Sequence, residues 1–156
     1  MNYREKYQSW IDDPFFDEAT KAELMGLTDE DEIEDRFYQD LEFGTAGLRG
    51  KLGAGTNRMN IYTVSMATEG LARTIENYGD EAKKKGVAIA YDVRLYSDEF
   101  AQIASRVLAA KGIKVYLFDD IRPTPMLSYA VRKLGTQSGI VVTASHNPQD
   151  YNGYKV

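Results

Sequence analysis

The chain has 156 residues, of which 43% are hydrophobic and 12% aromatic, enough to enclose one hydrophobic core. It contains no cysteine, so this sequence can form neither disulfide bonds nor thiolate metal sites. No apolar run approaches the roughly 20 residues of a membrane span, and the polar N-terminus is unlike a signal peptide. We therefore expect a soluble, cytoplasmic protein that does not bind membranes.

The net charge of −5 is unevenly distributed along the chain. Residues 1–43 hold 4 Lys or Arg against 14 Asp or Glu, whereas residues 44–156 hold 15 against 10. Six of the seven residues from Asp29 to Asp35 are carboxylates, which we interpret as a solvated helical face, with a docking surface as the alternative. The positive remainder suits an anionic ligand, but its basic residues are scattered, which argues against nucleic acid binding.

Helices are predicted for the first part of the chain. Residues 1–42 read as an acidic, helical N-terminal extension, in which Thr28 caps a helix with acids in its first turn. A further helix is predicted over residues 63–78, with Gly79 ending it. We expect the main domain to comprise residues 43–156.

Strands and helices then alternate with short links. This alternation predicts an α/β fold with a mostly parallel, mixed sheet, flanking helices and right-handed crossovers. Ligands of such sheets gather beyond the carboxyl ends of the strands. The predicted elements are a strand over 86–91, a helix from Ser97 ended by Gly112, a strand over 113–118, a helix from Thr124 with Pro125 at its first position and Gly135 as its stop, and a strand over 138–143.

Ser145 is the leading catalytic candidate, because it lies two residues beyond that last strand. The segment Ala144–Pro148 breaks the strand with hydroxyl, imidazole and amide groups, which puts a small nucleophile where a substrate can reach it. A serine hydroxyl needs an activator to act as a nucleophile, whereas a phosphoserine is itself a donor. A serine hydrolase is disfavoured, because the chain has no G-x-S-x-G elbow and His146, next to the serine, is its only histidine.

Two other segments carry candidate functional groups. Phe43–Gly50 has three glycines in eight residues, with Thr45 and Arg49 between them. Glycines let backbone amides approach an anion closely, and arginine can bind phosphate through two hydrogen bonds. Alone, this segment is only a glycine-rich turn. Asp92 and Arg94 follow the first predicted strand of the alternating region, where they could pair with neighbours and hold the catalytic loops.

Together, these segments resemble the α-D-phosphohexomutases, the family of phosphoglucomutase and phosphomannomutase. The resemblance lies in GTAGLRG near residue 45, Asp-x-Arg at residue 92, TASHNP around Ser145 and NGYK ending at Lys155. It covers residues 43–156 as the family's domain I, expected to be cut short at its C-terminal end. More loosely, it includes the helical extension typical of the longer phosphoglucomutase/phosphopentomutase branch.

The resemblance implies a mutase that moves phosphate between C1 and C6 of a hexose, from glucose 1-phosphate to glucose 6-phosphate. Ser145 would carry the phosphoryl group, a bisphosphate would be the intermediate, and Lys155 and Arg49 would perform acid–base chemistry. The other implied positions are Thr45, Arg49, His146 and Asn147 for phosphate or substrate binding, and Asp92 and Arg94 for support behind them.

The resemblance also implies cofactors and partners. Mg²⁺ would meet Ser145 through its phosphate, with its other ligands outside this chain, and glucose 1,6-bisphosphate would be the activator. The partners would be a sugar phosphate and the remaining domains of the same enzyme, so the isolated chain is expected to be inactive. Three alternatives remain open: a phosphopentomutase, a phosphomannomutase, or a non-catalytic module that binds anions. His146 could also be a purely structural turn residue.

Overall fold

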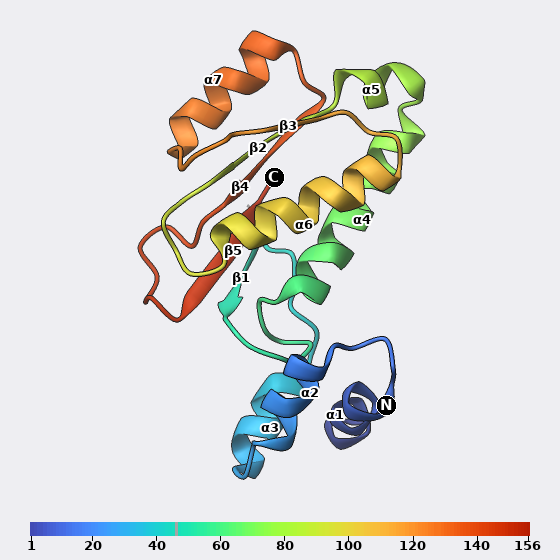
Figure 1. The fold of residues 1–156 in the computed structure, drawn as a ribbon, viewed down its shortest axis with the longest axis vertical. Helices are drawn as coiled ribbons and strands as arrows, with labels where there is room; N and C mark the ends of the chain where they lie inside the picture. Colours follow the sequence, from blue (N-terminus) through green and yellow to red (C-terminus); the bar gives the residue numbers. More distant parts are fainter. Residues whose placement is uncertain (46) are drawn as a thin grey trace.

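The structure is a computed structural model that describes residues 1–45 and 47–156. Ala46, in the glycine-rich segment, lies outside the described residues. Figure 1 shows three short helices at one end of the molecule and a layered α/β body at the other. The elements are α1 (Tyr3–Asp12), α2 (Glu18–Met25), α3 (Glu30–Phe37), β1 (Leu48–Lys51), α4 (Ile61–Asn77), α5 (Asp80–Lys85), β2 (Val87–Tyr91), α6 (Ser97–Ala110), β3 (Val115–Leu117), α7 (Thr124–Leu134), β4 (Ser138–Val142) and β5 (Tyr151–Lys155).

The body is built on a five-stranded sheet with the order β1-β5-β4-β2-β3. β2 pairs in parallel with β3 on one side and β4 on the other, while β5 runs antiparallel to both β4 and β1. The predicted α/β fold with a mostly parallel, mixed sheet and flanking helices is confirmed. β1 and β5 are additions to the three predicted strands, and β1 forms within the segment that the sequence presented only as a glycine-rich turn.

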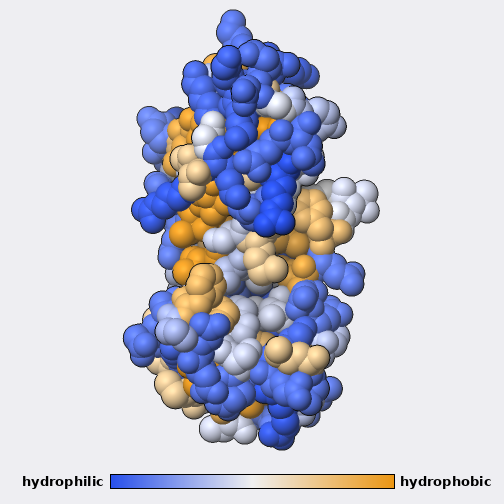
Figure 2. Space-filling model, turned by 90° about the vertical axis from the view of Figure 1, so that its right-hand side faces the viewer, coloured by the Kyte–Doolittle hydropathy of each residue, from blue (hydrophilic) through white to orange (hydrophobic). Residues whose placement is uncertain are grey.

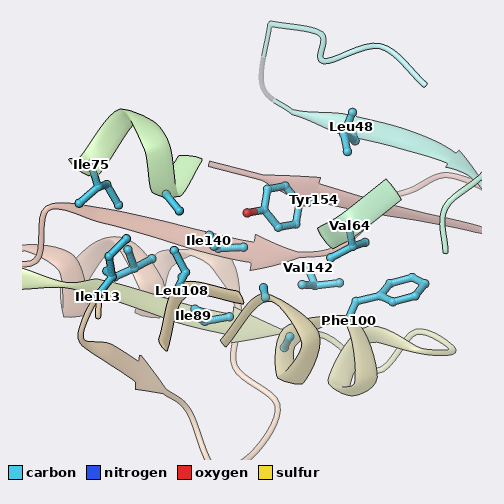
Figure 3. Packing of buried hydrophobic residues seen from close by; sticks show 14 of the residues in the cluster. Leu48, Val64, Ile75, Ile89, Phe100, Leu108, Ile113, Ile140, Val142 and Tyr154 are labelled. Carbon is cyan, nitrogen blue, oxygen red and sulfur yellow. The ribbon is translucent and has the colours of Figure 1, made fainter. Parts of the chain in front are cut away.

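Helices cover the two faces of the sheet unequally. The main core lies between the sheet and helices α4 and α6, where Ile89, Ile140 and Val142 pack with Leu108 and Tyr154 (Figure 3). A smaller core lies on the opposite face, where α7 packs against β2 and β4. On that face α7 therefore lies over the middle of the sheet, because β4 and β2 are inner strands.

Three predicted helix starts were displaced by one or two residues. Thr28 as a cap is wrong, because Asp29 caps α3 with a side chain that accepts a hydrogen bond from the first turn. α4 begins at Ile61, two residues earlier than predicted, because Asn60 accepts two backbone N–H groups of its first turn. Pro125 occupies the second position of α7 and not the first. At α3 and α4 a neighbouring polar side chain provides the cap, whereas α7 begins one residue before Pro125 without a side-chain cap.

Aromatic side chains attach the three N-terminal helices to the body. Trp10 is buried and stacks on Phe16 with ring centroids 4.2 Å apart. It also contacts Phe37 of α3 and Tyr62 of α4 edge-on, at 5.6 Å in both cases. Edge-to-face and offset aromatic pairs of this kind add to the stability that burial itself provides.

The acidic run of α3 is only partly a solvated face. Its Glu32 and Asp35 both pair with Arg58 of the body, whose side chain is 4% exposed, at 3.3 and 2.6 Å. Arg36 joins the same network through Glu32 and Glu23. A buried guanidinium needs such partners, so part of the acidic run is a docking surface within the molecule.

Apolar surface collects where the extension meets the body. Figure 2 shows hydrophobic residues across the middle of one side of the molecule, between largely hydrophilic ends. At this junction a cavity of about 580 Å³ is lined by Trp10, Leu41, Tyr62 and Met66, among others. Within the described residues, no helix is both long and apolar enough to cross a membrane.

Candidate functional site

Ser145 lies on an exposed loop that follows β4 and has a left-handed backbone, with φ at 57°. A non-glycine residue in this region is strained, so neighbouring groups must hold it there. One such group is the hydroxyl of Thr143, which accepts a hydrogen bond from the Ser145 N–H at 3.0 Å. The turn therefore presents the Ser145 side chain to solvent at the carboxyl end of a central strand.

Arg94 holds the backbone of this loop from beneath. Its guanidinium donates hydrogen bonds to four carbonyl oxygens, at distances of 2.7 to 3.1 Å. These carbonyls belong to Ser145, Asn147, Pro148 and Tyr151. Since arginine is a fixed planar fork with five donors, one side chain can fix the shape of the whole loop.

Asp92 in turn holds Arg94. One carboxylate oxygen accepts hydrogen bonds from the Arg94 N–H at 2.9 Å and the Ser97 hydroxyl at 2.7 Å. The other lies 3.7 Å from the Arg94 Nε. Asp92 therefore contacts the residue that binds the carbonyls of the Ser145 loop.

The pairing of β1 with β5 brings Arg49 and Lys155 to the same face of the sheet. Arg49 lies opposite Gly153, and antiparallel partners share a face, as do residues two apart on one strand. Lys155 also lies opposite Val141, which belongs to the core beneath α7. Both basic side chains therefore lie on the α7 face, beside the strand that leads to Ser145.

A direct contact joins Arg49 to the serine loop. The Nη1 of Arg49 lies 3.5 Å from the Oδ1 of Asn147, at the long limit of a hydrogen bond. The Oγ of Ser145 and the Nδ1 of His146 are 3.4 Å apart, a distance too long for a strong pair. His146 is exposed, so it can contact a ligand on this surface.

Glycines make the close approach of β1 and β5 possible. Gly47 has φ at 127°, and a Cβ there would lie 1.9 Å from the carbonyl oxygen of Tyr154. Gly44 and Gly47 exchange backbone hydrogen bonds, and Thr45, next to Gly44, is exposed. The glycine-rich segment is therefore required for packing as well as suited to an anion.

The structure thus brings Arg49 against Asn147 of the Ser145 loop and places Lys155 on the same face of the sheet as Arg49. It adds three polar residues that sequence reasoning missed as site components. Thr143 orients the backbone of Ser145, and Ser97 and Asn152 form a buried pair behind the loop. Thr143 and Asn152 are the first residues of the TASHNP and NGYK motifs, and Ser97 lies three residues after Arg94, but nothing else in the sequence marks them.

Two cavities of the described residues, of about 390 and 580 Å³, lie near the junction with the N-terminal helices and are lined by residues other than these. In residues 1–45 and 47–156, no three His, Asp or Glu side chains are grouped so as to hold a metal ion. The described residues therefore do not form a metal site by themselves.

Comparison with known proteins identifies the class of protein that this fold and site define. Residues 40–156 match the sequence model of phosphoglucomutase/phosphomannomutase, alpha/beta/alpha domain I. The match covers most of the chain and includes every candidate residue named above. The chain belongs to the phosphoglucomutase/phosphomannomutase family and carries its first α/β/α domain.

Relatives from distant organisms agree with this assignment. The chain is 49% identical over 123 residues to a phosphoglucomutase of Staphylococcus haemolyticus, covering 79% of this chain and 22% of that protein. It is 41% identical over 153 residues to a phosphopentomutase of Mus musculus, covering 94% and 24%. The chain therefore spans about a quarter of the length of these curated relatives.

A solved structure shares the fold. A Thermus thermophilus protein described as a phosphomannomutase superposes with a TM-score of 0.66 and 36% sequence identity. The match covers 75% of this chain and 25% of that one.

Proposed function

We propose that the protein carrying this domain is a phosphosugar mutase in which Ser145 carries the phosphoryl group. The single observation that supports this most is the contact of Arg49 with Asn147 of the Ser145 loop. Arg94 holds the loop, and the pairing of β1 with β5 places Arg49 and Lys155 on one face of the sheet. Phosphoryl transfer depends mainly on positioning and on neutralising charge, which this arrangement suits.

In the proposed step, an oxygen of a sugar hydroxyl bonds to the phosphorus on Ser145, and the bond from phosphorus to Oγ breaks. The hydroxyl proton passes to a nearby base, and the serine regains its phosphate from the other end of the bisphosphate. Lys155 and Arg49 are our candidates for transferring the proton and for neutralising the charge of the phosphate, because both lie on the α7 face of the sheet beside the loop. Thr45, His146 and Asn147 are proposed to contact phosphate or sugar, since Thr45 and His146 are exposed and Asn147 contacts Arg49.

The hexose 1-phosphate to 6-phosphate reaction is our first choice of substrate class. The phosphopentomutase relative supports a pentose phosphate as the second candidate, and the phosphomannomutase neighbour a mannose phosphate. Glucose 1,6-bisphosphate is the proposed activator. We also propose that Mg²⁺ meets the phosphate of Ser145 with its remaining ligands outside this chain, since the described residues offer no such group.

We propose further that residues 1–42 are an extension and 43–156 the catalytic-serine domain, and that the enzyme acts in the cytoplasm. The extension is supported by a second buried cluster around Trp10 and Phe37, which also includes Ala54 of the main domain. The remaining domains of the longer relatives are the proposed partners of this one. We expect the 156-residue chain alone to show no net conversion of glucose 1-phosphate.

The test is the intact mass of the longest natural form of the protein after incubation with glucose 1,6-bisphosphate and Mg²⁺. We expect one added phosphate, which peptide mapping assigns to Ser145, and none in Ser145→Ala. An unmodified protein, or a Ser145→Ala variant that still gains phosphate, would reject the proposal. Conversion of glucose 1-phosphate against ribose 1-phosphate then separates the hexose and pentose candidates.

A further inference from the structure

A buried chain of polar groups joins the strand of Lys155 to the loop after β2. Asn152, the second residue of β5, is fully buried and donates from Nδ2 to the Leu95 carbonyl and to the Ser97 hydroxyl, both at 3.0 Å. Its Oδ1 accepts the Gly153 N–H at 2.7 Å. Ser97, also fully buried, donates to Asp92 at 2.7 Å. Every polar atom of the Asn152 amide is therefore used.

The direction of these hydrogen bonds is determined by chemistry. An ionised carboxylate only accepts, so the single proton of the Ser97 hydroxyl points to Asp92. The Ser97 oxygen must then accept from Asn152, which orients the amide with its NH₂ toward Ser97 and its oxygen toward Gly153. The opposite orientation would set the amide oxygen against the Leu95 carbonyl and leave both groups without a donor.

The series of hydrogen bonds from Asn152 through Ser97 to Asp92 closes into a ring through Arg94. Asp92 accepts from the Arg94 N–H, and Arg94 binds the carbonyls of Ser145 and Tyr151. The peptide between Tyr151 and Asn152 is thus held from both sides: by Arg94 on its carbonyl oxygen and by the buried amide that follows. Because Asn152 and Ser97 are fully buried, a shift of either side chain would leave a buried polar group without a partner.

We propose that Asn152 is a positioning residue that, through Ser97 and Asp92, fixes the strand of Lys155 relative to the loop of Ser145. This rests on the proposed function, in which those two side chains act on one phosphate. Lys155 is three residues beyond Asn152 on the same short strand, so its distance from the serine follows the register that Asn152 sets. Asn152 faces the main core, so it touches no ligand at the exposed site.

The test compares Asn152→Ala, Ser97→Ala and the double variant in the longest natural form of the protein. Two measurements are made: the rate at which Ser145 gains phosphate from increasing glucose 1,6-bisphosphate with Mg²⁺, and hydrogen exchange of residues 144–155. We expect each single variant to lower the maximal rate by about tenfold or more while the half-saturating concentration is unchanged, because misplaced groups lose rate without losing binding. The double variant should be no slower than the slower of the two single variants, because both substitutions break the same series of hydrogen bonds.

Thr68→Val is the matched control. It removes the buried hydroxyl of Thr68, which hydrogen-bonds the Tyr154 hydroxyl at 3.0 Å. Tyr154 lies on the same strand as Asn152 but takes no part in the ring of hydrogen bonds through Arg94. The control should lower the melting temperature as the other variants do, yet leave the phosphorylation rate and the exchange of residues 144–151 unaltered. A control that slows phosphorylation equally, or single effects on the rate that simply add, would overturn the proposal.

The exchange measurement separates this proposal from the proposed function. If the unaltered protein gains no phosphate, the function fails, but the role of Asn152 is still decided by exchange. Faster exchange of the loop in Asn152→Ala and not in Thr68→Val supports it, and equal exchange in both rejects it.

Discussion

Arg49 and Asn147 lie 98 positions apart in the chain, yet the guanidinium of one lies 3.5 Å from the side-chain oxygen of the other. The contact exists because β1 adds to the sheet next to β5, while the Ser145 loop connects β4 to the same strand. A phosphate on Ser145 would therefore lie near a permanent positive charge. The first prediction concerns that charge.

Arg49→Lys should slow phosphate uptake by Ser145 about tenfold or more. Lysine keeps the positive charge but lacks the planar pair of N–H donors that matches two phosphate oxygens. A hydrogen bond to a charged group contributes about 1.5–3 kcal/mol, so the loss of one lowers the rate by about tenfold or more. Lys51→Ala, at the next outward position of β1, is the control because it is also exposed. Timed intact-mass measurements check both, and an equal loss in the two variants would contradict a specific role for Arg49.

Arg94→Lys should loosen the loop without unfolding the sheet. A lysine can still pair with Asp92 but cannot reach all four carbonyls that the guanidinium binds. We expect faster hydrogen exchange across residues 144–151 and slower phosphorylation of Ser145. Arg106→Lys, an exposed substitution on α6, provides the control. Unchanged exchange in Arg94→Lys would mean that the loop keeps its shape by other contacts.

Gly47→Ala should destabilise the domain more than Gly79→Ala. Both glycines have positive φ, which costs an alanine about 1–2 kcal/mol. Only at residue 47 does the new Cβ also meet backbone, 1.9 Å from the Tyr154 oxygen, whereas nothing lies within 4 Å of it at residue 79. The free energies of unfolding in urea check the difference, and equal losses would show that β1 can move away from β5 at no cost.

The docking of the N-terminal helices should weaken in acid. Burial raises the pKa of Glu32, but hydrogen bonds and charges from Arg36 and Arg58 outweigh it, so its pKa is lower in the folded protein than the usual 4.5. A carboxylate with a lowered pKa stabilises the folded state above its unfolded pKa, and this contribution is lost as the pH falls through the folded pKa. We therefore expect the extension to loosen as the pH drops below about 4.5.

Trp10 offers the measurement, because it is the only tryptophan and is buried within the extension. Its fluorescence should shift with falling pH in the unaltered protein. In Glu32→Gln the shift should be smaller and the extension less stable at neutral pH, whereas Glu34→Gln, exposed on the same helix, should behave like the unaltered protein. Identical pH profiles for all three would show that the Glu32 network does not hold the extension.

Local sequence determined much of the architecture. The apolar spacing of α6 and the stop at Gly135 of α7 placed these helices within a residue or two, because periodicity and capping act over single turns. The buried strand before Ser145 was equally clear, so the serine was placed at a carboxyl end correctly. The cap of α3 was predicted wrongly, because Thr28 and Asp29 are both good capping residues and only the packed helix selects one of them.

The tertiary structure decided what surrounds that serine. No local pattern predicts that Arg94 binds four carbonyls of a loop 50 residues away, that Asn152 is buried against Ser97, or that Arg58 is the partner of two acids of α3. Backbone carbonyls and amide side chains can form hydrogen bonds with many partners, including water. Which partner is used is decided only where packed strands and loops exclude water. The sequence by itself therefore determined the family, the order of the elements and the candidate nucleophile, whereas long-range pairing of β1, β5 and the loop after β2 decided which groups hold it in place.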